Sequence, residues 1–488
     1  MKTTKILAAL ALCALAALPA RAMTWSVNPS NANQIVDDTG SWTLTLSNFN
    51  QTYDGVQYVG KEITGSAYAE NGANGVLDLT TAEADTSYKI VSVGNNRWEN
   101  NTSLTEVYLP DTIVNIGRQA FRNDTNLTKA KLPNIFAKWH TDGAHFSGCS
   151  ALTTVYYTGV EPEAGVAKLP PSMKVLPYFF LGSCTSIERV EAPGVEITYN
   201  RALPGMTSLK SVALSPNLRA LLTNGSNWNQ SLFRNDTSYL PNLVDFYPTV
   251  FSAGFDPVAS ALSVTNGQQV QTLTCGGNGQ FASTAITNYF DFSACSFTTL
   301  PEMYFCNSRI AGATLPATVT TIGQKAFLGL GYTAGFQGNN IPRIRFLGDL
   351  PTFGGTGGNT ALYPYNGNRG PKATGTSYRY AVVVDAETYP AWTNSANFVK
   401  MSDVANSSIA NVKDYFSANS SDFPTPDFPE ETLGVTLDGS ADGRYNWLVQ
   451  YVDHSTVTAT WMNGEEVYTD ATAVAVGGAP EAPAGTPM

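Results

Sequence analysis

The sequence predicts a β-rich solenoid, in which short, similar units stack on one another and bury a shared apolar core. Three observations predict it. Only 14% of the 488 residues are charged and 42 are glycine, which is typical of turn-rich β proteins. A motif recurs at an offset of about 23 residues, and apolar and polar residues alternate within each copy. Such units cannot bury their apolar faces alone, so neighbours must stack.

The repeat is visible by direct alignment. Residues 89–104 match residues 112–127, and residues 104–110 match 127–133, both at the same offset. A distant copy at 315–327 has the Leu-Pro, Ile-Gly and Ala-Phe pairs of 109–121 in the same places. The region from 209 to 290 is more degraded, and inserts lengthen its spacing.

Each unit can be interpreted physically. In 104–109 a short strand turns Val107 and Leu109 inward and Glu106 and Tyr108 outward. Pro110 ends the strand because it has no N–H to donate. Further along the same copy, Ile113 and Ile116 are predicted to form a second inward pair. Gly117 is expected to mark a turn, and Phe121 is expected to fill the core from the far side.

The pattern LxxVxLPxxVxxIGxxAFxxCxxL resembles the BspA-like (treponemal-type) leucine-rich repeat class of bacterial surface proteins. The resemblance covers 76–403, and the segments 53–58 and 380–392 resemble the usual lead-in and closing strand. It implies a leucine-rich repeat array of roughly 23-residue units. It also implies adhesion to, or capture of, an extracellular protein or glycan.

The remaining segments are assigned by composition. Residues 1–22 read as a cleaved secretory signal peptide, with Lys2 and Lys5 before an apolar run and Ala-Arg-Ala before the cut. This signal predicts a secreted or cell-surface protein without a lipid anchor or a later membrane span. The other boundaries are an N-terminal β cap at 23–75, a linker at 404–430, a small C-terminal β module at 431–478 and a flexible tail at 479–488.

Charge excludes some partners. The formal net charge is −11, so the basic surface that nucleic acid requires is absent and anionic membranes are disfavoured.

The cysteines are not expected to form a reactive or metal-binding site. Cys149, Cys184 and Cys295 share one repeat slot with Asp124, and we expect buried thiols there. A single disulfide between stacked rungs, such as Cys149 with Cys184, is the alternative. The count of five after signal cleavage, with Cys275 and Cys306, leaves at least one thiol unpaired within the chain.

No CxxC zinc spacing and no Gly-x-Ser-x-Gly motif occurs, so no metal, cofactor or catalytic residue is predicted. His140 and His145, with Asp142, are interpreted as a polar insert rather than a metal site. The strings at 55–61 and 329–334 imitate nucleotide-binding motifs but lack the required structural context.

The outward strand positions form the candidate binding site. Tyr and Arg recur there, and both are enriched in binding hot spots. An ordinary solvated sheet face is the alternative interpretation. The candidate residues are Glu106, Tyr108, Lys129, Lys131, Tyr156, Arg189, Glu191, Asp245, Tyr247, Arg343 and Arg345, with Thr154 beside Tyr156. We expect their side chains to form one continuous exposed face.

Three functions follow from these observations. The first is a non-catalytic protein that binds an extracellular protein or glycan. The second is a structural envelope or surface-layer component that assembles with copies of itself through exposed strand edges. The third and weakest is a hydrolase that uses the insert at 140–145.

Overall fold

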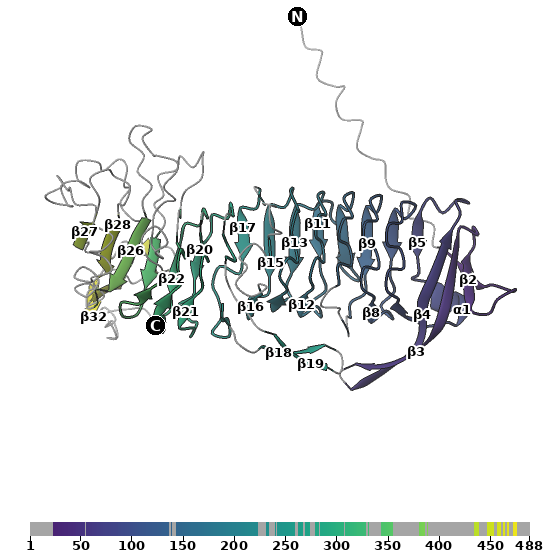
Figure 1. The fold of residues 1–488 in the computed structure, drawn as a ribbon, viewed down its shortest axis with the longest axis horizontal. Helices are drawn as coiled ribbons and strands as arrows, with labels where there is room; N and C mark the ends of the chain where they lie inside the picture. The colour runs from purple at the N-terminus through teal and green to yellow at the C-terminus, as the bar shows by residue number, and fades with distance from the viewer. Residues whose placement is uncertain are drawn as a thin grey trace, which may run out of the picture.

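The computed structural model shows an elongated array of stacked rungs, with antiparallel strands at its N-terminal end (Figure 1). It describes residues 23–53, 55–135, 138, 143–222, 231–233, 240, 242–258, 262–266, 269–273, 279–282, 284–306, 308–327, 330, 343–354, 380–385 and 388, and the strands after 430. The predicted signal peptide, linker and tail lie outside the described residues.

One large sheet runs along the first part of the array. Its eight strands are all parallel, as expected when each rung adds one strand in the same direction. In spatial order they are β5 (Val76–Asp78), β7 (Glu106–Tyr108), β9 (Lys129–Leu132), β10 (Thr154–Tyr157), β11 (Val166–Lys168), β13 (Arg189–Ala192), β15 (Ser211–Leu214) and β17 (Asp245–Tyr247).

A second row consists of strands of two to four residues, each of which comes after a strand of the large sheet along the chain. It comprises β6 (Ile90–Val93) with β8 (Asn115–Ile116), and then β12 (Val175–Leu176), β14 (Ile197–Thr198) and β16 (Ala220–Leu221). These strands come from the second apolar pair of each repeat, as Ile116 shows.

The spacing between rungs varies. Glu106 pairs with Lys129, which is 23 residues later, and Lys129 pairs with Thr154. Thr154 pairs in turn with Val166, so the chain re-enters the same sheet after only residues 158–165. The array therefore consists of leucine-rich-type parallel rungs whose connections differ in length.

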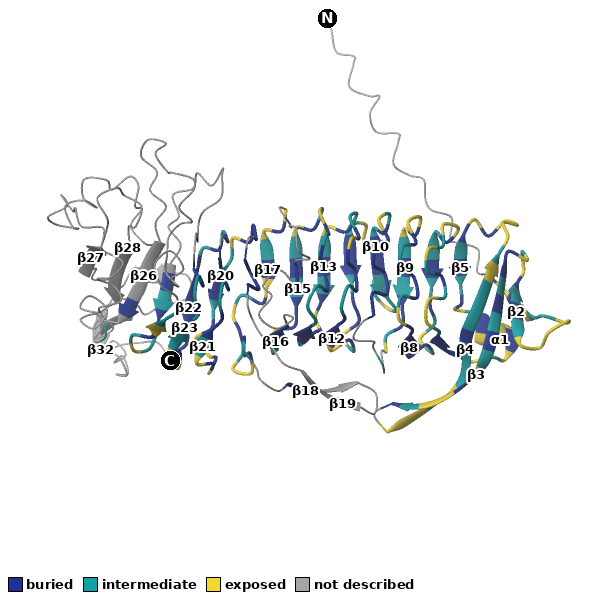
Figure 2. Ribbon diagram, in the orientation of Figure 1, coloured by how far each residue is buried: buried dark blue, intermediate teal, exposed yellow. Residues whose placement is uncertain are grey.

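The core lies between the two rows (Figure 2). Inward residues such as Val107 and Leu127 are completely buried. Trp98, Phe121 and Phe146 occupy one slot in successive rungs and stack with ring centroids 5.1 Å apart. Such continuous burial between neighbours gives a stacked array its stability.

The turns beyond the second row have their own hydrogen-bond ladder. The N–H groups of Gln119, Phe121 and Asn123 each donate to a carbonyl of the next rung, at 2.6, 3.0 and 2.7 Å. Gln119 and Asn123 have positive φ, and the Ala120 N–H donates to the Gly117 carbonyl at 3.3 Å, so a turn begins at Gly117 as expected. Gly117 has another role. A Cβ there would lie 2.4 Å from the carbonyl carbon of Gly94, so close approach of the rungs requires glycine.

The N-terminal segment is antiparallel and joins the second row. Its strands are β1 (Trp25–Val27), β2 (Gln34–Asp37), β3 (Trp42–Tyr53) and β4 (Val56–Tyr68), and β4 pairs in parallel with β6. The short helix α1 (Ala82–Thr86) packs near β1.

Two indole groups reach the outer edge of β5. Trp42 Nε1 donates to the Val76 carbonyl at 2.6 Å, and Trp25 Nε1 donates to the Asp78 carbonyl at 2.7 Å. These carbonyls point away from β7 and would otherwise form an open sheet edge.

Beyond β17 a second parallel sheet begins. It contains β20 (Tyr289–Asp291), β22 (Gly312–Leu315), β24 (Arg343–Phe346) and β26 (Tyr380–Asp385), and its opposite row is β21 (Thr299–Leu300), β23 (Thr321–Ile322) and β25 (Thr352–Phe353). The hairpin of β18 (Leu262–Asn266) and β19 (Gln269–Leu273) comes from the insert between the sheets.

The C-terminal strands begin by extending this second sheet. β28 (Trp447–Val452) pairs in parallel with β26, and β27 (Gly434–Asp438) pairs antiparallel with β28. Two separate pairs follow: β29 (Thr456–Ala459) with β32 (Thr472–Ala475), and β30 (Met462–Asn463) with β31 (Glu466–Val467). The predicted module at 431–478 therefore shares backbone pairing with the array.

Candidate binding surface

The outward residues of the large sheet align in two columns because its parallel strands are in register. One column follows the first outward position of each strand and the other follows the second. The first contains Val76, Glu106, Lys129, Thr154, Val166, Arg189, Ser211 and Asp245, and the second contains Asp78, Tyr108, Lys131, Tyr156, Lys168, Glu191, Ala213 and Tyr247. We call these two columns the strand face.

Most of the predicted side chains are half-buried within the strand face (Figure 2). Tyr247 is 45% exposed, whereas Thr154 is buried. The structure thus brings together the nine predicted residues from Glu106 to Tyr247 on one sheet.

The backbone pairing of the large sheet ends at β17, before the last two predicted residues. β17 and β20 belong to different sheets, so Arg343 and Arg345, in β24, lie on the second sheet and not on the large one. The backbone N–H of Thr287 still donates to the Val244 carbonyl at 2.9 Å, which holds the two parts together. A long insert between the strands breaks the pairing. The Arg343 side chain lies outside the described structure, and Arg345 is half-buried.

Two charged members of the strand face were missed. Lys168 pairs with Glu191 across β11 and β13, and Asp78 pairs with Tyr108 across β5 and β7. The Leu169-Pro170 pair gave a usable signal, because it marks the end of a strand as Leu109-Pro110 does. Extending that match backwards by one residue would have found Lys168.

Charges on the strand face are arranged in local groups. Lys129 Nζ lies 3.4 Å from a carboxylate oxygen of Glu106, and the Tyr108 hydroxyl donates to the same carboxylate. Arg189 contacts both Glu191 at 2.8 Å and Glu163 at 2.7 Å. Half-exposed pairs of this kind stabilise the fold by at most about 1 kcal/mol. Their main consequence is to fix the orientation of side chains that a partner would meet.

Two tyrosines of the strand face, Tyr108 and Tyr156, remain protonated at neutral pH. Partial burial raises the pKa of Tyr108 well above its usual range, and the hydrogen bond to Glu106 adds to this rise. Burial also raises the pKa of Tyr156, with smaller effects of Glu106 and Asp78. The Tyr108 hydroxyl already donates to Glu106, whereas the Tyr156 hydroxyl can donate to a partner at neutral pH.

The shared cysteine slot holds thiols. Cys149 Sγ donates to the Phe121 carbonyl at 2.9 Å, and Cys184 Sγ donates to the Phe146 carbonyl at 3.0 Å. The alternative of a disulfide between these two residues is wrong, because the four described cysteines are all free. Burial raises the pKa of the Cys184 thiol to about 12, so it is unreactive at neutral pH. Cys275 lies outside the described residues.

The histidine insert has one described histidine. His145 is buried, and its Nε2 lies 3.0 Å from the Ile116 carbonyl oxygen. His140, Asp142 and His454 lie outside the described residues. Within the described ranges, no group of three or more histidine, cysteine or acidic side chains could hold a metal ion. The described ranges also contain no helix long and apolar enough to cross a bilayer.

Parallel rungs with an outward polar column and an inward Leu/Val row define a leucine-rich repeat protein. A sequence profile of the BspA-type leucine-rich repeat region matches residues 78–161 and 259–344, with six copies of the repeat. The chain carries BspA-type leucine-rich repeats.

Solved structures are similar at low identity. A leucine-rich repeat protein from Bacteroides ovatus is 17% identical, with 62% of this chain and 93% of that chain covered and a TM-score of 0.29. A leucine-rich cell surface protein from Faecalibacterium prausnitzii is 15% identical, with 63% and 87% covered and a TM-score of 0.25. No curated protein matches this chain significantly.

Proposed function

We propose that this chain is a non-catalytic secreted or cell-surface protein that captures an extracellular protein or glycan through its strand face. The observation that carries the proposal is the second column, where Tyr108, Lys131, Tyr156 and Lys168 follow one another on adjacent strands. A partner spanning several rungs would contact aromatic and cationic side chains at once. Both features are typical of binding surfaces on solenoids.

The N-terminal strands would act as a cap in this proposal. The indoles of Trp25 and Trp42 hydrogen-bond the outer carbonyls of β5, which disfavours addition of another strand there. This feature argues against self-assembly through the N-terminal end of the sheet. The predicted signal peptide at 1–22 fits export, and an array of roughly 23-residue units follows it.

The test is a binding screen of residues 23–488 against extracellular-matrix proteins, mucins and glycans at two salt concentrations. Replacing Tyr108, Tyr156 and Tyr247 together with Ala should weaken a saturable interaction by about tenfold or more. Lys131→Ala should also weaken it. The matched control is Lys174→Ala, because Lys174 precedes β12 in the opposite row.

Three outcomes would count against the proposal. Unchanged binding in the tyrosine variant would place recognition elsewhere. A large drop in melting temperature would mean that these tyrosines act as core residues. An apparent molar mass from light scattering that rises with concentration, without any ligand, would favour the self-assembling alternative.

A further inference from the structure

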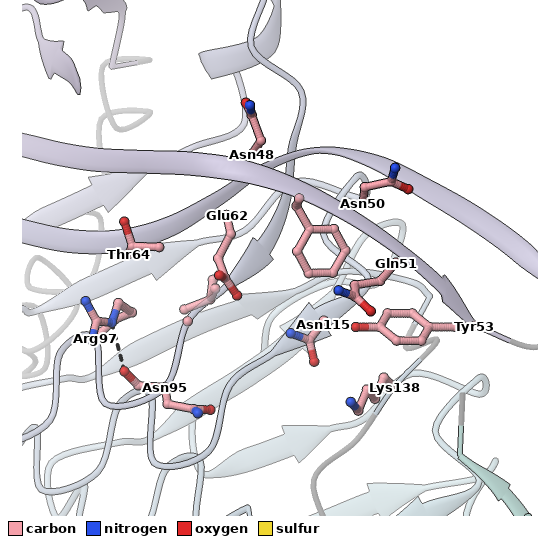
Figure 3. Close-up of a pocket in the computed structure, with 13 residues that line it drawn as sticks. Asn48, Asn50, Gln51, Tyr53, Glu62, Thr64, Asn95, Arg97, Asn115 and Lys138 are labelled. Atoms are coloured by element: carbon pink, nitrogen blue, oxygen red, sulfur yellow. Dashed lines mark hydrogen bonds between the residues drawn. The ribbon is translucent and has the colours of Figure 1, made fainter. Parts of the chain in front are cut away.

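A cleft of about 550 Å³ lies between the β3–β4 hairpin and the β6–β8 row, apart from the strand face (Figure 3). Its size falls within the roughly 300–1,000 Å³ that small-molecule sites occupy. Its lining comes from five separate parts of the chain: 48–53, 62–64, 93–97, Asn115 and Lys138. The site therefore exists only when the hairpin is folded over the first rungs.

The hairpin is held in place by an apolar contact beside the cleft. Phe49 and Tyr53 pack with Val91 and Val114 in one buried cluster. Both rings are nearly covered, with 7% and 6% of their surface exposed. They support the wall of the cleft, but they offer little apolar surface to a ligand.

Asn115 is the clearest sign that the cleft binds something. Its side chain is 7% exposed, and its Nδ2 donates to Ser92 Oγ at 2.8 Å. Ser92 Oγ donates in turn to Glu62 Oε1 at 3.0 Å. The Asn115 Oδ1 atom has no hydrogen-bond partner among the described residues. A buried acceptor without a donor costs about 1–3 kcal/mol, so this atom is suited to a ligand's O–H or N–H group.

The other polar side chains of the cleft indicate which chemical groups the ligand has. Among the amide residues of the lining, Gln51 and Asn95 remain for a ligand, and an amide group can both donate and accept hydrogen bonds, which matches the mixed character of sugar hydroxyl groups. The side chains of Asn48 and Asn50 point away from the hollow, and their Oδ1 atoms accept from Lys61 Nζ and Gln57 Nε2, both at 2.8 Å. Figure 3 shows Gln51, Glu62, Asn115 and Lys138 around the same hollow.

The charged side chains of the cleft indicate the charge of the ligand. The lining contains two cations, Arg97 and Lys138, and one carboxylate, Glu62, which is already bonded to Ser92. This local excess of positive charge stands in a chain with a formal net charge of −11. Lys138 Nζ lies 5.5 Å from the centre of the Tyr53 ring, which holds the ammonium group at the edge of the cleft.

We propose that this cleft binds an acidic saccharide, such as a uronic acid unit of a glycan. A ring hydroxyl donates to Asn115 Oδ1, the side-chain amides of Gln51 and Asn95 bond other hydroxyls, and the carboxylate faces Lys138 and Arg97. The covered aromatic rings make an apolar ligand or a peptide anchored by large side chains a poorer fit. The site is independent of the strand face and does not require the function proposed above.

The test uses residues 23–488 and compares glucuronic acid with glucose by calorimetric titration and by ligand-observed NMR. Gln51→Ala, Asn115→Ala and Lys138→Ala should each weaken glucuronic acid binding by about tenfold or more. Asn33→Ala and Lys89→Ala remove an amide and an ammonium group from exposed positions outside the cleft and should leave binding unchanged. Since Gln51 is exposed, its variant separates a binding defect from a folding defect.

The proposal is overturned if glucuronic acid shows no saturable binding up to its solubility limit. It is also overturned if glucose binds equally well, or if binding survives Gln51→Ala and Lys138→Ala in chains that melt like the wild type. Loss of binding in the triple tyrosine variant of the strand face, with the cleft variants unaffected, would assign the saccharide to the strand face instead.

Discussion

Gly117→Ala should destabilise the first rungs of the array, because the new methyl group would meet the backbone of the preceding rung. The added Cβ would lie 2.4 Å from the Gly94 carbonyl carbon and 2.5 Å from the Asn95 nitrogen. Ordinary carbon contacts are about 3.5–4.0 Å, so the rungs must separate by about 1 Å. The neighbours are backbone atoms and cannot move aside as a flexible side chain would.

The magnitude follows from two contributions. Overpacking of this kind costs about 1–3 kcal/mol. Separation would also lengthen the bond from Gly117 N–H to the Val93 carbonyl, now 2.7 Å, whose net value is about 1 kcal/mol. The expected loss is therefore about 2–4 kcal/mol.

The assay must resolve single rungs, because stacked repeats do not always unfold in one cooperative step. Hydrogen exchange should show faster exchange of the Val114 and Gly117 amides, while distant rungs keep their protection. The matched control is Gly254→Ala: a Cβ there has no neighbour within 4 Å, and φ of Gly254 is not positive. Equal protection in the two variants would refute the explanation of Gly117 by close approach.

Two further predictions concern buried polar groups. Trp42→Phe removes the N–H group that bonds the Val76 carbonyl and should lower the free energy of unfolding by about 1–3 kcal/mol more than Trp98→Phe does. Trp98→Phe is the control because Trp98 Nε1 has no described partner. Thermal melts of the two variants would show the difference, and equal losses of stability would contradict the capping role of Trp42. Burial raises the pKa of Asp124 to about 8, so the folded state retains a proton that the unfolded state loses above about pH 4. The contribution of Asp124 to stability should therefore fall as the pH rises from about 4 to about 8. Asp124→Asn keeps the acceptor for the Asn101 N–H and should make the melting temperature less dependent on pH over this range. The same pH dependence of the melting temperature in the wild type and the variant would contradict the raised pKa of Asp124.

The sequence by itself determined the rung and its inward side. Val107, Leu109, Ile116 and Phe121 were assigned to the core from alternation and spacing alone, and all four are buried. This worked because every rung repeats the same local pattern, so one correct alignment fixes many positions. The same alternation placed Glu106 and Tyr108 on the outward side of β7.

Tertiary structure decided how the rungs meet. The loop at 158–165 returns the chain to the same sheet and adds Lys168 to the strand face, while a longer insert separates Arg345 from it. Loop length is only weakly constrained by energy, so it cannot be read from the repeat pattern. The role of Gly117 likewise depends on the distance to Gly94 in the neighbouring rung.

The cleft depended on tertiary structure most of all. Gln51, Glu62, Asn115 and Lys138 belong to different elements, and no sequence spacing links them. They meet because Phe49 and Tyr53 on the hairpin pack against Val91 and Val114 of the first rungs. Local alternation specifies which side chains point inward, whereas packing of separate elements specifies which polar groups face the same space.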